Sequence, residues 1–197
     1  MNWVYPVEAD FTQRVAMPQE ICPLPKLGFF PGSTIGNMVA RTAIDLLRNW
    51  REALGEESLL LIGIDRIKDI AVLERAYDDP AGVTAAFNLN LLERINRELG
   101  GDIPVENFIH RAIWNDVHAR IEMHLVAACD VDFIIDGRGY HMAAGETIHS
   151  ENSHKYGARD ANLLLRASGW TPIATWDDTD PAFALILAEA TAFRSAP

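Results

Sequence analysis

The chain has 197 residues, 49% of them hydrophobic, and a formal net charge of −11. This length fits one domain with room for an inserted lobe, and it can bury a substantial core. The negative charge argues against nucleic-acid binding, which needs clustered Lys and Arg, and the lack of a run of about 18 apolar residues argues against a membrane span.

The N-terminal residues and the cysteines indicate the compartment. Residues 1–6 lack the charged and then apolar pattern of a secretory signal, so we expect a cytoplasmic protein. Cys22 and Cys129 lie far apart and fit no metal or redox spacing. We expect both to be reduced, partly buried thiols.

The first third of the chain predicts half of a doubly wound sheet. The expected elements are a short extended segment, a strand, a helix and a buried strand, at Val4–Phe11, Leu27–Phe30, Met38–Leu54 and Ser58–Asp65. This β–β–α–β order is typical of an α/β fold. With no further strand beside Val4–Phe11, one sheet edge is open, and we expect the isolated chain to self-associate or to dissolve poorly.

The middle of the chain predicts an inserted lobe, residues 70–155, between core segments 1–69 and 156–197. The expected helices are Ala71–Tyr77, Val83–Leu99 and a short one at Pro104–Arg111. Two strands expected to form a hairpin and a third strand follow, at Arg120–Ala128, Val131–Ile135 and Tyr140–Ala144. The chain then predicts a helix at Ala158–Ser168 and a closing antiparallel pair at Trp170–Asp177 and Ala182–Ala188.

The turn after the Leu27–Phe30 strand is the first candidate site. Gly32 and Gly36 let a ligand approach the backbone, and Asn37 offers two donors and an acceptor. A side chain at the carboxyl end of such a strand points into the crevice where α/β folds bind ligands. The alternative is a plain strand-to-helix turn with an N-cap.

The second candidate is the segment between the lobe and the last helix. In an extended segment Glu151 and Ser153 share a face, and a carboxylate beside a hydroxyl can bind an imidazole ring. The alternative is a solvated acid, with Ser153 capping the following helix. Tyr77 either bonds a ligand carboxylate or is a half-buried residue at a helix end, and Met123 alternates with apolar neighbours as core or pocket lining.

Several reaction types have no motif in this chain. The six histidines show no i,i+4 pair and no partner cysteines, so we expect no metal site. No Gly-x-Ser-x-Gly elbow and no Walker loop with its Lys are present, which argues against acyl-transfer hydrolases and P-loop enzymes.

Five segments in the same order resemble one known family. They are Phe30-Pro-Gly-Ser-Thr-Ile-Gly-Asn37, Ala76-Tyr-Asp-Asp79 with Gly82-Val-Thr-Ala-Ala-Phe-Asn-Leu-Asn90, Ile95-Asn-Arg-Glu-Leu99, Arg120-Ile-Glu-Met123 and Gly145-Glu-Thr-Ile-His-Ser-Glu-Asn-Ser153. From about Tyr5 to Leu187 the chain resembles the S-adenosylmethionine-dependent L-histidine Nα-methyltransferases that begin ergothioneine synthesis.

The resemblance implies a fold, a reaction and roles for particular residues. It implies a partial Rossmann-like class I methyltransferase sheet, with residues 70–155 as the substrate-recognition lobe. Asp10, Phe11 and Gly32 correspond to residues that bind the methyl donor, Asp10 and Phe11 at its adenine end. Asn37 and Tyr77 correspond to those that hold the amino-acid end of the substrate, and Met123, Glu151 and Ser153 to the imidazole pocket. Methyl transfer to an amine is an in-line displacement that needs alignment and no catalytic nucleophile.

The resemblance covers only the C-terminal portion of the family. The glycine-rich first loop, the acid that binds the ribose and the first two strands have no counterpart here, and Met38-Val-Ala-Arg-Thr-Ala43 departs from the family's helix start. Two hypotheses follow. The chain is a truncated histidine methyltransferase, or it is a non-catalytic remnant or split half that binds an amino acid or a partner chain supplying the N-terminal half.

Overall fold

The structure is a computed structural model that describes residues 4–178 and 182–191. The chain divides into two compact units. The first, Met1–Ile67 with His154–Pro197, is called the core unit, and the second, Lys68–Ser153, is called the lobe. Helices and strands mix in one chain, which confirms the expected α/β class. No helix among the described residues is long and apolar enough to cross a membrane.

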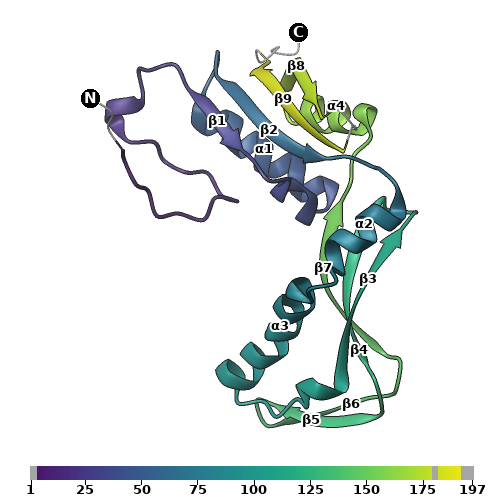
Figure 1. The fold of residues 1–197 in the computed structure, drawn as a ribbon. Helices are drawn as coiled ribbons and strands as arrows, with labels where there is room; N and C mark the ends of the chain where they lie inside the picture. The colour runs from purple at the N-terminus through teal and green to yellow at the C-terminus, as the bar shows by residue number, and fades with distance from the viewer. Residues whose placement is uncertain (1–3, 179–181, 192–197) are drawn as a thin grey trace. The chain divides into compact units, whose positions relative to one another are not determined.

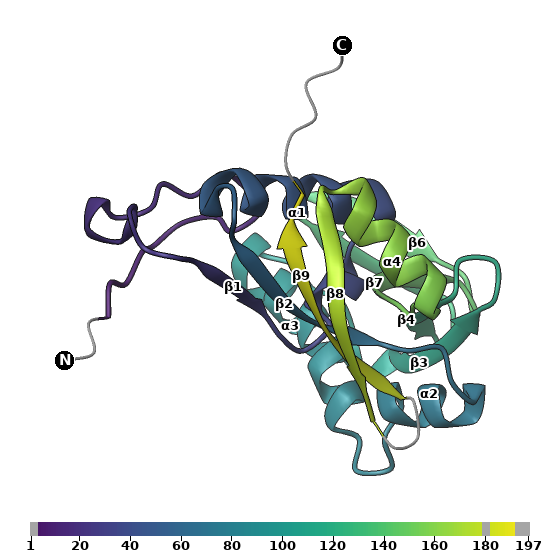
Figure 2. The ribbon, with the colours of Figure 1, turned by 90° about the horizontal axis from the view of Figure 1, so that it is seen from above.

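The core unit is built on a four-stranded sheet (Figures 1 and 2). In spatial order the strands are β1 (Leu27–Phe30), β2 (Leu59–Asp65), β9 (Phe183–Ala190) and β8 (Trp170–Asp177). β1 and β2 are parallel, whereas β9 runs antiparallel to both β2 and β8. The expected closing pair of antiparallel strands is therefore confirmed.

Two helices cover one face of this sheet, α1 (Ala40–Leu54) and α4 (Ala158–Ala167). Leu47 of α1 and Leu165 of α4 are fully buried in one cluster with Ile62 of β2. Trp170 is also fully buried there, and its indole N–H donates to the carbonyl of Leu47. Residues of the opposite strand face are exposed, including Leu27, Phe29 and Leu185.

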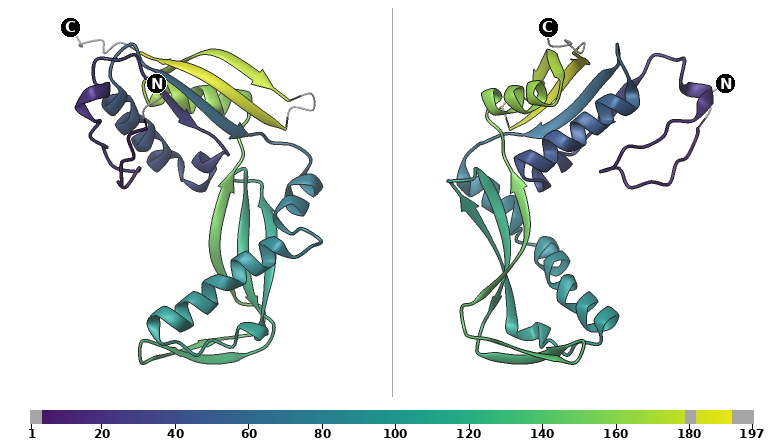
Figure 3. Two further views of the ribbon diagram at one scale, coloured as in Figure 1. Left: turned by 60° about the vertical axis from the view of Figure 1, so that its left-hand side comes forward. Right: turned by 180° about the vertical axis from the view of Figure 1, so that it is seen from behind.

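The lobe combines two helices with two small sheets (Figure 3). Its helices are α2 (Ile70–Tyr77) and α3 (Val83–Leu99). One sheet has the order β3 (Phe108–Asn115), β4 (Arg120–Ala127) and β7 (Thr147–His154), and the other is the hairpin β5 (Val131–Ile135) and β6 (Arg138–Met142). Leu92 of α3 and Leu125 of β4 are fully buried in its main cluster.

Three short 3₁₀ turns complete the elements of residues 4–178 and 182–191. They are η1 (Gln19–Ile21), η2 (Thr34–Asn37) and η3 (Val105–Asn107). η2 directly follows the turn after β1, so it carries Asn37 at its end.

Three expectations about the elements and one about the cysteines are wrong. No strand or helix is assigned within Val4–Phe11. The helix expected at Pro104–Arg111 is only η3 followed by β3, because Phe108, His110 and Ala112 alternate with exposed residues as in a strand. β4 pairs with β3 instead of β5, and β5 pairs with β6. Both cysteines are free, as expected, but exposed instead of partly buried.

The two chain segments that connect the core unit to the lobe are paired with each other. Arg66, just after β2, forms an isolated parallel bridge with Tyr156, just after β7. The backbone N–H of Ile67 donates to the carbonyl of Tyr156 at 3.4 Å, and that of Tyr156 donates to the carbonyl of Asp65 at 3.0 Å. The two connections are thus held side by side.

Candidate functional site

The turn after β1 has a backbone shape that glycine favours. Gly32 has φ +73°, and a Cβ placed on it would meet no heavy atom within 4 Å. Ser33 is also left-handed, with φ 55°, and its hydroxyl accepts a hydrogen bond from the backbone N–H of Asp65 at 2.9 Å. The turn is therefore tied to the end of β2, with open space beside Gly32.

Asn37 is exposed at the end of η2 and does not cap the next helix. The N-cap of α1 is Val39, which makes no side-chain capping bond, so the N-cap alternative for this turn is wrong. The carbonyl of the preceding Gly36 accepts a hydrogen bond from Nδ1 of His154 at 2.8 Å. The sequence contained no signal for His154, because the bond joins residues 118 positions apart.

Asp10 and Phe11 lie in the irregular segment before η1. Asp10 Oδ1 accepts from the backbone N–H and the hydroxyl of Thr12, at 2.9 and 2.6 Å, and these bonds lower the pKa of Asp10. The ring of Phe11 lies 6.3 Å from that of Phe30, between centroids. Phe11 and Trp50 also line an apolar cavity of about 230 Å³.

In the lobe, the structure brings Tyr77 and Ser153 together. Their hydroxyl oxygens are 2.7 Å apart, although 76 positions separate the residues. Ser153 is 5% exposed and belongs to β7. It does not cap α4, whose N-cap is Gly157, so the capping alternative for Ser153 is wrong.

A buried polar chain fixes the backbone of Tyr77. Nε2 of His110 donates to the Tyr77 carbonyl at 2.8 Å, and Nδ1 of His110 accepts from the Asn88 amide at 2.9 Å. The Asn88 oxygen in turn accepts from the Ser150 hydroxyl at 2.6 Å. His110 and Asn88 are 7% and 3% exposed. The chain therefore links α2, α3, β3 and β7, and sequence reasoning missed all three of its side chains.

Glu151 lines a second cavity, of about 180 Å³, along α3. Its neighbours there include Phe87, Leu91, Arg94 and Ser150. Partial burial raises the pKa of Glu151, because removal from water disfavours the charged carboxylate. Met123 is 4% exposed in β4, and its carbonyl accepts from the Ser150 hydroxyl at 3.0 Å, but its side chain is not part of this cavity's lining.

The structure leaves one expected relationship open. Asn37 lies in the core unit, and Tyr77, Glu151 and Ser153 lie in the lobe. That these residues bind one substrate together, as the resemblance implies, stays a prediction.

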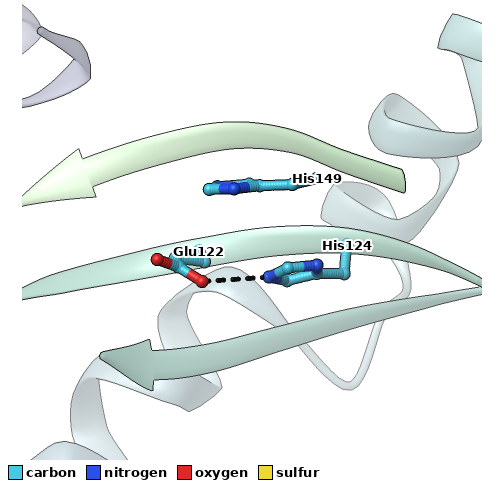
Figure 4. Close-up of side chains that lie close together, drawn as sticks. All are labelled: Glu122, His124 and His149. Atoms are coloured by element: carbon cyan, nitrogen blue, oxygen red, sulfur yellow. Dashed lines mark hydrogen bonds and ion pairs between the residues drawn. The ribbon is translucent and has the colours of Figure 1, made fainter. Parts of the chain in front are cut away.

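A cluster that the sequence analysis did not expect lies on β4 and β7 (Figure 4). Glu122 and His124 come from β4, and His149 comes from β7. One ligand atom of each lies within 4.8 Å of the others, an arrangement that could hold a metal ion. The i,i+2 spacing of Glu122 and His124 on a strand was a usable signal, since such residues share a face. His149 was not foreseeable, because it belongs to another strand.

Comparison with known proteins gives consistent matches. Residues 3–190 match the family described as histidine-specific methyltransferase, SAM-dependent. The histidine N-alpha-methyltransferase of Mycolicibacterium smegmatis is 40% identical over 172 residues, which cover 83% of this chain and 51% of the relative. The ergothioneine biosynthesis protein 1 of Neurospora crassa is 27% identical over 154 residues, covering 74% of this chain and 16% of the relative.

The chain spans about half the length of the mycobacterial relatives it matches. Among solved structures, that of the CcbJ methyltransferase from Streptomyces caelestis aligns with 95% of this chain and 64% of its own, at 11% identity and a TM-score of 0.49. That likeness is too low to assign a function.

Proposed function

Because the chain belongs to the family of histidine-specific, S-adenosylmethionine-dependent methyltransferases, we propose that it forms the substrate-recognising half of such an enzyme. The reaction is methyl transfer from S-adenosylmethionine to the α-amino group of histidine or a related amino acid. The 40% identity to a histidine N-alpha-methyltransferase supports this proposal. The remaining half is supplied by residues outside this sequence or by a partner chain, since the chain spans 51% of that relative.

The hydroxyl pair of Tyr77 and Ser153, two residues from Glu151, carries the proposal. A neutral imidazole has one N–H donor and one nitrogen acceptor. Glu151 accepts from the ring N–H, and the hydroxyl of Ser153 donates to the other nitrogen, while Tyr77 keeps that hydroxyl oriented. Met123 contributes an apolar side chain from β4, the strand next to β7. A substrate without ring nitrogens leaves these groups unpaired, at a cost of about 1–3 kcal/mol each.

The core unit has features that fit a methyl donor. The donor supplies an electrophilic methyl group on a positively charged sulfonium sulfur. Gly32 presents open space where any other residue would place a Cβ, so a ligand can approach the backbone there. The apolar cavity beside Phe11 fits an adenine ring, and Asp10 offers carboxylate oxygens to adenine N–H groups.

No residue needs to act as a nucleophile in this reaction. The residues bind the amino acid, hold its amine unprotonated and in line with the methyl–sulfur bond, and exclude water. We assign the amino-acid end of the substrate to Asn37 and Tyr77. The family's glycine-rich donor loop has no counterpart among the 197 residues, so we assign only the contacts of Asp10, Phe11 and Gly32 with the donor to this chain.

We also propose a cytoplasmic location. Cys22 and Cys129 are both free and exposed, a state that reducing compartments favour.

Tritium transfer tests the function. The chain is assayed with histidine and methyl-tritiated S-adenosylmethionine, alone and joined in frame to the sequence encoded upstream of it. We expect transfer by the joined protein and its loss in Glu151→Ala, with exposed Glu98→Ala as the matched control. Transfer that is equal in both variants would contradict the assigned recognition residue. A joined protein that binds the donor but transfers no methyl to any amino acid would support a non-catalytic remnant.

A further inference from the structure

One group of side chains in the lobe plays no part in the proposed function. Glu122, His124 and His149 point toward one another from two neighbouring strands (Figure 4). Nε2 of His124 lies 3.1 Å from Oε2 of Glu122. The rings of His124 and His149 stack with centroids 4.7 Å apart and planes 20° apart. Three potential metal-binding atoms therefore lie within 4.8 Å of one another.

The two oxygens of Glu122 have different partners. Oε1 accepts three hydrogen bonds, two from Arg120 at 2.8 and 2.6 Å and one from the Asn115 amide at 2.9 Å. Oε2 faces His124 instead. The Glu122 side chain is 10% exposed, so these bonds hold an ionised carboxylate in a largely buried position with one oxygen directed at the cluster.

The ring of His124 is oriented in a similar way. Its Nδ1 lies 3.2 Å from the hydroxyl of Thr147, which leaves Nε2 directed at Glu122. Such partners on the second ring nitrogen are what orient histidines that bind metals. His149 is exposed, and its Nε2 is 3.1 Å from the carbonyl oxygen of Glu151. An exposed ring can turn toward an ion without displacing core residues.

We propose that Glu122, His124 and His149 bind one divalent transition-metal ion of the Zn²⁺ type, through Oε2 and one nitrogen of each imidazole. Two imidazoles and one carboxylate are a donor set that Zn²⁺ accepts, with a fourth position left for water. Mg²⁺ and Ca²⁺ are unsuited, because they require six or more ligands that are mostly oxygen.

The alternative is a purely structural network of Arg120, Glu122 and His124, and calorimetry with Zn²⁺ distinguishes the two. The chain is used without an affinity tag and in buffer free of histidine. We expect one Zn²⁺ per chain, and His149→Ala should weaken binding at least about tenfold. His149 is exposed, so this variant should keep its fold. His141→Ala is the matched control, since His141 is exposed and pairs with Asp132 on the β5–β6 hairpin.

Cobalt gives a second readout that does not depend on stability. Co²⁺ in place of Zn²⁺ should produce the visible absorption of a four-coordinate ion, and His149→Ala should abolish it. No saturable Zn²⁺ binding below about 1 mM would overturn the proposal. Equal affinities of His149→Ala and His141→Ala, or heat from Mg²⁺ equal to that from Zn²⁺, would overturn it as well.

Discussion

The ammonium group of Lys155 lies 2.6 Å from Oδ2 of Asp65, and the Lys155 side chain is completely buried. Asp65 ends β2, and its backbone N–H and carbonyl also bond Ser33 and Tyr156. One acidic residue therefore links the turn after β1, the end of β2 and the segment that returns from the lobe. The ion pair therefore holds the side chain of the residue at which these three segments meet.

Replacing Lys155 should destabilise the core unit strongly. Lys155→Met removes the buried partner of a carboxylate that is itself only 17% exposed. We expect a loss of about 3–5 kcal/mol in the free energy of unfolding, measured by urea denaturation. The double variant Asp65→Asn with Lys155→Met should recover part of that loss. An unchanged denaturation midpoint in Lys155→Met would show that the pair contributes little.

Removing the Tyr77 hydroxyl should affect binding more than folding. Tyr77→Phe loses the 2.7 Å contact with Ser153 but keeps the ring and the backbone bond to His110. We expect a loss of about 1 kcal/mol in stability and a clear loss of histidine affinity in calorimetric titration of the upstream-extended protein. Tyr140→Phe is the control, because Tyr140 is exposed on β6. Equal histidine affinities for the two variants would count against a role of Tyr77 in recognition.

Glu151 should make stability depend on pH in an unusual direction. Burial raises its pKa above the ordinary value of 4.5, so the folded state favours the neutral acid. The resulting stability is complete below about pH 4.5 and is lost as the pH rises through the raised pKa. Glu151→Gln should therefore gain melting temperature relative to the parent chain as the pH rises, while losing histidine affinity.

Glu98 provides the opposite case for comparison. Hydrogen bonds from Arg94 and Arg97 lower the pKa of Glu98, so its contribution to stability is present above the ordinary pKa of 4.5 and is lost as the pH falls. Glu98→Gln should therefore melt at a lower temperature than the parent chain near neutral pH, and this difference in melting temperature should shrink as the pH falls. If both variants respond to pH with the same sign, the burial argument for Glu151 is wrong.

Asp79 should stabilise the start of α3. Its carboxylate accepts from the backbone N–H groups of Val83 and Thr84, at 3.1 and 2.8 Å, and bonds from Thr84 are the main cause that lowers its pKa to about 2. Asp79→Ala should lower the melting temperature at neutral pH. The difference should shrink as the pH falls from about 3.8 toward about 2, because the parent chain then loses the charged form. Asp78→Ala serves as the neighbouring control.

The exposed edge of β1 should promote association. Among the described strands β1 pairs only with β2, and Leu27 and Phe29 are 55% and 58% exposed. Open apolar edges pair with other chains. We expect Phe29→Lys to shift the chain toward monomer in sedimentation velocity experiments. Leu163→Lys changes an equally exposed residue on α4, so an identical shift in both variants would rule out a specific effect of the edge.

Elements with strong local periodicity could be predicted from the sequence. α3 matches the expected Val83–Leu99 range, because its apolar residues recur at helical spacing and glycines border it. The β8–β9 pair was also predicted, since its two strands follow one another in the chain. The helix expected at Pro104–Arg111 failed because a short apolar run fits either period.

Contacts between distant residues could not be predicted in this way. Tyr77 and Ser153 were each candidates, but their contact spans 76 positions and depends on how β7 joins the lobe. The pairing of β4 with β3 was missed for another reason, because residues 104–111 were expected to form a helix and β4 therefore had no strand before it to pair with. No sequence pattern indicated that His110 and Asn88 would form a buried hydrogen bond behind Tyr77.

The bridge between Arg66 and Tyr156 bears on how this architecture can diversify. When the two ends of an inserted segment are hydrogen-bonded to each other, the segment can change in length or sequence without straining the sheet into which it is inserted. The lobe could therefore be exchanged as a whole, while the strand order in the sheet of the core unit stayed the same.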